Sequence, residues 1–254
     1  MPENDAPPIP EAARQGGDVT APAAHTVKAF DDDLERLRAL VAEMGGLAEA
    51  AIDHATQALM RRDSALAARV IAEDGRIDAL AAVIEREGVC IIALRAPMAD
   101  DLREIVSALK IAVLIERLGD FAKHIATRVA IMQDHRWIEP ISVLPAMLAT
   151  VKGVVTAALD AFAARDPLPA LAMTQQRRVV NDFYDSLFRA LLTHMMEDAQ
   201  TITPCAHLLF IAQSLERIGD HAAIVAEVVH FSVTGERLRA ASQDPDLAPR
   251  RTER

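Results

Sequence analysis

The sequence predicts an all-α protein made of two tandem three-helix bundles. Aromatic residues form only 4% of the 254 residues while apolar residues reach 51%, which favours helices over strands, because strands draw on aromatic and β-branched side chains. Apolar side chains recur at helical spacing, and no segment shows sustained two-residue alternation. A six-residue motif occurs twice, starting at positions 115 and 215, which indicates an internal repeat.

Prolines and helix-capping residues divide the chain into six predicted helices. These helices span residues 27–61, 64–95, 97–136, 142–164, 167–199 and 204–234. Asp63 is a candidate N-cap for the second helix, and Asp166 with Pro167 opens the fifth. Pro97 and Pro204 open the third and sixth helices, because proline is tolerated in a first turn, where N–H groups lack intrahelical partners.

Two bundles between two tails are the expected domain organisation. Residues 1–25 are rich in proline and residues 236–254 contain two prolines and end in several arginines, which is typical of disordered tails. The first bundle is expected over 26–136 and the second over 137–235, joined near 134–140.

The charge balance narrows the classes of function. With 27 basic and 37 acidic residues the net charge is −10, which argues against a nucleic-acid binder.

No apolar run reaches about 18 residues, so we expect no transmembrane helix, and the N-terminus lacks the hydrophobic stretch of a secretory signal. Cys90 and Cys205 are interpreted as small buried side chains in a reducing compartment. These features together predict a cytoplasmic protein.

The repeated motif pairs two carboxylates with a glycine. Residues 115–120 read Ile-Glu-Arg-Leu-Gly-Asp, and residues 215–220 read Leu-Glu-Arg-Ile-Gly-Asp. The Glu and Asp of each motif lie one turn apart on one helix face. Like charges at that spacing cost about 0.2–0.5 kcal/mol, and a mid-helix glycine costs roughly 1 kcal/mol. Because this unfavourable combination occurs twice, it indicates a shared requirement.

Both motif helices carry an apolar stripe that should face the core, which would leave the carboxylates on an accessible face. The stripe residues are Ile111, Ile115, Leu118 and Ile125, and Ile211, Leu215, Ile218 and Val225. Gly119 and Gly219 are expected to permit close helix approach.

The acidic pairs could hold a metal ion, because carboxylates are hard oxygen ligands. Asp74 and Asp78 are also four residues apart, and with Glu116 and Asp120 they would place four carboxylates on two helices. His124 could add a nitrogen, which would suit iron, manganese or zinc.

The corresponding stretch of the second half would give a weaker site. Beside Glu216 and Asp220, Asn181 offers only a neutral oxygen and Arg177 would repel a cation. Alternatively, the acidic residues are simply solvated or paired with arginines such as Arg117 and Arg217.

The sequence lacks the usual signatures of an active site. It contains no Gly-x-Gly dinucleotide fingerprint, no Walker loop and no Gly-x-Ser-x-Gly, and neither cysteine has a recognisable acid–base neighbour. We therefore predict no catalytic residues, no organic cofactor and no enzymatic activity.

The doubled motif, residues 95–103 (Arg-Ala-Pro-Met-Ala-Asp-Asp-Leu-Arg) and residues 194–198 (His-Met-Met-Glu-Asp) together resemble the PhoU family. This family contains accessory and regulatory proteins of the phosphate-specific transport system. The resemblance runs from about Val27 to Thr234, which is nearly the whole expected helical region, while the long N-terminal tail has no counterpart in the family core.

The resemblance implies two three-helix bundles in a cytoplasmic, often dimeric protein that reaches the membrane only through partners and binds no nucleic acid. Such proteins act as negative regulators of the phosphate-starvation response, linking the ATPase subunit of the phosphate ABC transporter to the sensor histidine kinase. Their acidic motifs bind surface metal ions; iron, manganese, zinc and magnesium are the candidates.

Carried over by position, the family's first metal site is Asp74, Asp78, Glu116 and Asp120, and its second is Asn181, Glu216 and Asp220. Asn181 stands where many members have Asp, and Arg177 where an acidic residue is common. Two other functions stay open at this point: a metal-dependent hydrolase in which paired metals activate water, and a purely structural helical adaptor.

Overall fold

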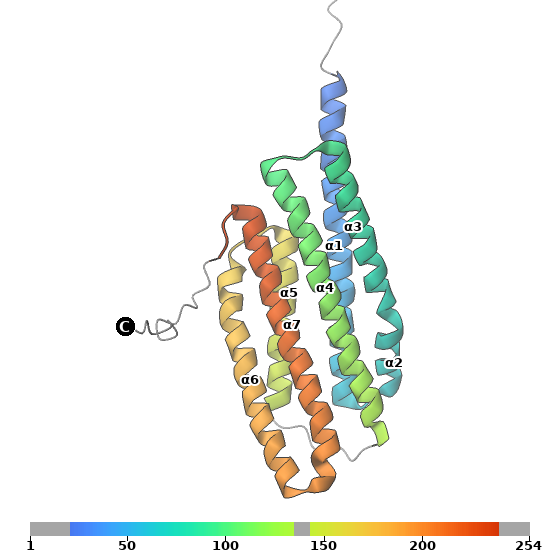
Figure 1. Ribbon diagram of the computed structural model, residues 1–254, viewed down its shortest axis with the longest axis vertical. Coiled ribbons are helices and arrows are strands. Elements are labelled where there is room, and N and C mark those ends of the chain that lie inside the picture. Colours follow the sequence, from blue (N-terminus) through green and yellow to red (C-terminus); the bar gives the residue numbers. More distant parts are fainter. Residues whose placement is uncertain (1–20, 135–142, 239–254) are drawn as a thin grey trace, which may run out of the picture.

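The computed structural model describes residues 21–134 and 143–238, and within these ranges it contains helices and no strands (Figure 1). The helices are α1 (Ala21–Arg61), α2 (Ser64–Glu73), α3 (Gly75–Arg95), α4 (Ala99–Ile131), the short η2 (Met132–Asp134), α5 (Val143–Ala164), α6 (Pro169–Glu197), the short η3 (Ala199–Thr201) and α7 (Ile202–Thr234). The first bundle is formed by α1, α2 with α3, and α4; the second is formed by α5, α6 and α7. The predicted all-α fold of two tandem three-helix bundles is confirmed.

The two bundles pack against each other mainly through their motif helices. The helices α4 and α7 lie side by side in the middle of the molecule, and α1 also contacts α5 (Figure 1). Ion pairs cross this junction: Lys152 of α5 bonds Asp53 of α1, and Arg165, just after α5, lies 3.0 Å from Glu104 of α4. The hydrogen bond and the positive charge of Lys152 lower the pKa of Asp53.

Local side-chain chemistry explains where several helices begin. Asp63 caps α2 as predicted, because its Oδ1 accepts a hydrogen bond of 2.9 Å from the backbone N–H of Leu66. Pro204 lies in the first turn of α7, as expected. The predicted starts of the third and fifth helices were two residues too early: Pro97 lies in the connection before α4, and α6 begins at Pro169.

Two differences from the predicted helices matter for the site and the tails. The predicted helix over 64–95 is interrupted at Asp74, which separates α2 from α3 although its backbone keeps right-handed helical angles (φ −55°, ψ −40°). The helix α1 already begins at Ala21, inside the predicted tail. The rest of both predicted tails, and most of the predicted joint near 134–140, lie outside the described residues.

The predicted core stripe is buried. Its eight members on α4 and α7 are each no more than 1% exposed. Each fully buried aliphatic side chain of this kind contributes about 1.5–3 kcal/mol through removal of apolar surface from water. Cys205 is buried as expected, but Cys90 is exposed, so the interpretation of Cys90 as a core residue was wrong.

The absence of a transmembrane helix stays a prediction. By length and composition alone, α5 among the described residues is long and apolar enough to cross a membrane, a test that core helices also pass. In this fold it packs against α6, α7 and α1, and it contributes Met147, Val151, Val155 and Ala158 to the common core.

Gly119 marks a close approach between α4 and α3. A Cβ added to Gly119 would lie 2.7 Å from Cδ1 of Ile77, a buried side chain of α3. A Cβ at Gly219 would meet Val180 of α6 at 3.4 Å, an ordinary contact. The expectation that these glycines permit close packing is therefore confirmed for Gly119, whereas Gly219 leaves room for a methyl group.

We expect Gly219→Ala to raise the free energy of unfolding by up to about 1 kcal/mol, because alanine is the better helix former. Gly119→Ala should gain less or lose stability, because the added methyl must displace Ile77. Urea unfolding of both variants measures the difference. Equal changes in the two variants would contradict a special requirement for glycine at position 119.

Candidate functional site

Three of the four carboxylates predicted for the first site share one groove. Asp78 comes from the first turn of α3, and Glu116 and Asp120 come from the middle of α4. All three line a cavity of about 530 Å³ between these helices. Glu85, about two turns after Asp78 on α3, also lines this groove. Sequence analysis missed it because it considered only carboxylates one turn apart.

Asp74, the fourth predicted residue, does not line this groove and is 5% exposed. Its Oδ2 accepts a hydrogen bond of 2.6 Å from Nζ of Lys123. This bond and the charge of Asp74, together with the charges of Asp120 and Asp78, raise the pKa of Lys123. The first acidic face therefore already contains one ammonium group, which sequence analysis did not identify.

Arginine pairing, the alternative considered from sequence, also occurs on this face. Arg117 lies 3.2 Å from Asp120, one turn further along α4. His124 lies elsewhere: it lines the groove between α4 and α7, and its ring is in edge contact with that of Phe121. The expectation that His124 adds a nitrogen ligand to the first carboxylate cluster is therefore not supported.

The second acidic face is built by α6 and α7. Arg177 of α6 donates from Nε to Oδ1 of Asp220 at 2.6 Å, and the Asp220 side chain is 16% exposed. At the other end of this face, Asp185 of α6 interacts electrostatically with Glu216 of α7. Asn181 lies one turn from both Arg177 and Asp185 along α6, which places it between these two contacts.

Glu216 has the clearest electrostatic perturbation of the predicted site residues. Its pKa is raised by burial first, and then by the neighbouring charges of Asp220 and Asp185, against the opposing effect of Arg217 and Arg177. Burial, Glu216 and Asp185 also raise the pKa of Tyr184. Sequence analysis missed Asp185, although its spacing of four from Asn181 repeats the spacing of Asp74 and Asp78.

The oxygen donors of both faces suit a hard cation, but Asp74, Asp120 and Asp220 are paired with the protein's own cations. Among residues 21–134 and 143–238, no three His, Cys, Asp or Glu side chains are grouped closely enough to hold a metal ion. Oδ1 of Asn181 is buried without a hydrogen-bond partner, which leaves one acceptor on the second face unused. Metal ligation by either set stays a prediction.

Comparison with known proteins relates this chain to one family. The family model described as the PhoU domain matches residues 41–129 and again 144–229, one match in each bundle. A phosphate-specific transport system accessory protein PhoU homolog of Zymomonas mobilis is 49% identical over 223 residues, covering 88% of this chain and 94% of the relative. A homolog of the same description from Caulobacter vibrioides is 44% identical over 227 residues, covering 88% and 96%.

Solved structures agree with the sequence relatives. The crystal structure of PhoU from Pseudomonas aeruginosa matches with a TM-score of 0.77 and 36% identity, covering 82% of this chain and all of that one. The phosphate transport system regulatory protein PhoU from Streptococcus pneumoniae matches with a TM-score of 0.76 and 26% identity, covering 83% and 99%. With its two domain matches, its helix order and its doubled acidic motif, the chain belongs to the PhoU family.

Proposed function

We propose that this chain is a non-enzymatic negative regulator of the phosphate-starvation response and of phosphate uptake. The observation that carries the proposal is the pair of acidic faces, repeated on α3–α4 and α6–α7 in a chain whose relatives are named as accessory proteins of phosphate transport. Its proposed partners are the ATPase subunit of the phosphate ABC transporter and the phosphate sensor histidine kinase. The chain would act as a homodimer and would contact these partners on the cytoplasmic side of the membrane.

Regulation of this kind requires different affinities for two partner states, because a ligand shifts an equilibrium only by differential binding. Partly exposed carboxylates suit docking to a basic patch on a partner, and the net charge of −10 would steer such an encounter. When phosphate is plentiful, the proposed contact would hold the kinase in its phosphatase-competent state and restrain uptake.

Metal ions form part of this proposal. Asp74, Asp78, Glu116 and Asp120 would hold one ion, and Asn181, Glu216 and Asp220 a second, with iron, manganese, zinc or magnesium as candidates. A bound ion would supply positive charge to the face and coordination positions for a partner. Lys123 and Arg177 occupy carboxylates of these sets and so compete with the ion.

The double substitution Glu216→Ala with Asp220→Ala tests the second face. We expect a phosphatase reporter that is repressed in phosphate-rich medium to become active, because the docking surface loses both motif carboxylates. The matched control is Asp182→Ala, an exposed carboxylate of α6 outside the cluster. Full repression by a folded double variant would contradict a role for this face.

The substitution Lys123→Gln tests competition at the first face. We expect manganese affinity to rise by roughly tenfold, about 1.4 kcal/mol, because the ammonium no longer occupies Asp74. Without metal the variant should unfold more readily, since a buried carboxylate loses its partner, and added manganese should restore stability. Calorimetric titration and thermal unfolding measure both effects. Lys110→Gln, elsewhere on α4, serves as the control, and unchanged metal affinity in Lys123→Gln would contradict the competition.

The raised pKa of Glu216 predicts a pH-dependent stability in metal-free protein. The folded state holds this proton above the ordinary pKa of 4.5, so the unfolded state ionises first and stability falls as pH rises through that interval. Glu216→Gln should therefore be more stable than the parent chain near neutral pH and equal to it at pH values well below 4.5. Urea unfolding at both pH values measures the free energy of unfolding. A variant less stable than the parent chain at neutral pH would contradict the prediction, because it would show that the ionised Glu216 stabilises the fold.

A further inference from the structure

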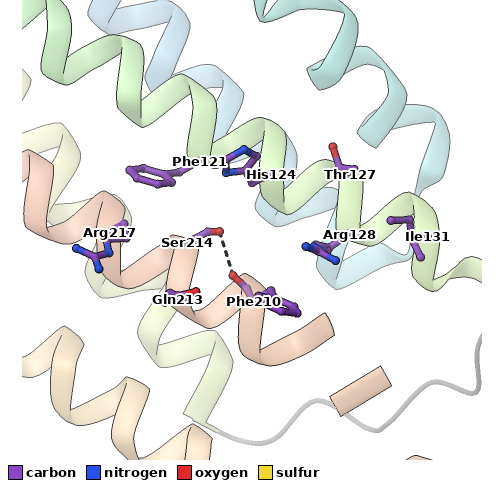
Figure 2. A pocket seen from close by; sticks show the side chains of 9 residues that line it. All are labelled: Phe121, His124, Thr127, Arg128, Ile131, Phe210, Gln213, Ser214 and Arg217. Carbon is purple, nitrogen blue, oxygen red and sulfur yellow. Dashed lines mark hydrogen bonds between the residues drawn. The ribbon is translucent and has the colours of Figure 1, made fainter. Parts of the chain in front are cut away.

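A second cavity lies between α4 and α7, and it differs in charge from the acidic faces. Figure 2 shows side chains of α4 along one side and side chains of α7 along the other. The cavity volume is about 510 Å³, within the range of about 300–1,000 Å³ that is usual for small-molecule sites. Although the chain has a net charge of −10, the lining contains two arginines and a histidine and no Asp or Glu.

Arg217 lines this cavity, and the second motif, to which it belongs, differs from the first motif in which arginine pairs with the motif aspartate. In the first motif, Arg117 pairs with Asp120. In the second, Asp220 accepts its hydrogen bond from Arg177 of α6. Arg217, the counterpart of Arg117, interacts with the charge of Glu216 but forms no close ion pair among the described residues, and it lines the α4–α7 cavity.

Arg128 of α4 presents the other guanidinium. Its Cζ atom lies 4.4 Å from the ring centroid of Phe210, which is a cation–π contact. A guanidinium in such a contact still has N–H groups that can bind an acceptor. Nη1 of Arg128 also lies 3.5 Å from Nδ1 of His207, which helps to fix its orientation.

Two further polar side chains complete the lining, whereas the hydroxyls do not contribute donors. His124 and Gln213 make no hydrogen bond to another residue of the described ranges. The hydroxyl of Thr127 donates to the carbonyl of Lys123, and that of Ser214 donates to the carbonyl of Phe210 (Figure 2). The available donors are therefore two guanidinium groups, one amide and one imidazole.

We propose that the α4–α7 cavity binds the phosphate group of a small anionic ligand. Two arginines line the cavity and no Asp or Glu does, and arginine binds phosphate oxygens through paired N–H donors. Glu216 interacts electrostatically with Arg217 and opposes this attraction, whereas charges beyond roughly 8 Å are screened at physiological ionic strength. The inference requires neither metal binding nor the proposed regulatory role.

Two sources could supply this phosphate group. Inorganic phosphate would use the donors alone, whereas an organic phosphate would also contact the apolar walls formed by Phe121, Ile131 and Phe210. Equilibrium dialysis of the full chain against inorganic phosphate and, separately, against phenyl phosphate distinguishes them. Ionic strength is held constant with chloride, so that a general salt effect does not contribute.

The variants Arg128→Gln and Arg217→Gln test the site, and Arg117→Gln is the matched control, since it removes the same charge at the equivalent position of the other motif. We expect each cavity variant to weaken binding by about tenfold or more, and the control to change it less than about twofold. Thermal unfolding confirms that all three variants are folded.

Binding of inorganic phosphate that both cavity variants weaken supports a free-phosphate site. Binding of phenyl phosphate alone, with the same sensitivity, supports an organic phosphate. Absence of binding of both compounds to the parent chain, or binding that is equally affected by Arg117→Gln, overturns the proposal. Each of these results is independent of the repression assay on the second acidic face.

Discussion

The burial of one stripe of α4 and of its counterpart on α7 is the constraint on which the rest of the structure depends. Ile115, Leu118 and their equivalents are almost completely removed from water, which fixes the rotation of each helix about its axis. Once this rotation is set, Glu116 and Asp120 must point toward α3, and Glu216 and Asp220 toward α6. The acidic faces and the basic cavity are therefore different sides of the same two helices.

The two halves satisfy the same electrostatic requirement with different residues. A pair of carboxylates one turn apart is unfavourable unless positive charge lies nearby. In the first half this charge comes from α4 itself, through Lys123 and Arg117. In the second half it comes from Arg217 on α7 and, through a direct hydrogen bond to Asp220, from Arg177 of the neighbouring helix. Duplication has preserved the carboxylates but not the identity of their counterions.

The sequence was sufficient to predict whatever depends on helical periodicity or on the repeat. The core stripe, the facing of the motif carboxylates and the cap at Asp63 follow from residues a few positions apart. The pair of Lys123 with Asp74 joins residues 49 positions apart, and the contact between Asp185 and Glu216 also joins separate helices. Such contacts depend on how far packed helices are shifted along each other, which one sequence does not contain. The interruption at Asp74 did have a local signal, the Asp74-Gly75 pair, which the sequence analysis did not use.

The junction between the bundles also has a mechanical consequence. Glu104 bonds both Arg38 of its own bundle and Arg165 of the other, so a force applied to one bundle is transmitted through a shared carboxylate as well as through the apolar contact. A ligand bound between α4 and α7 would contact both bundles at this junction.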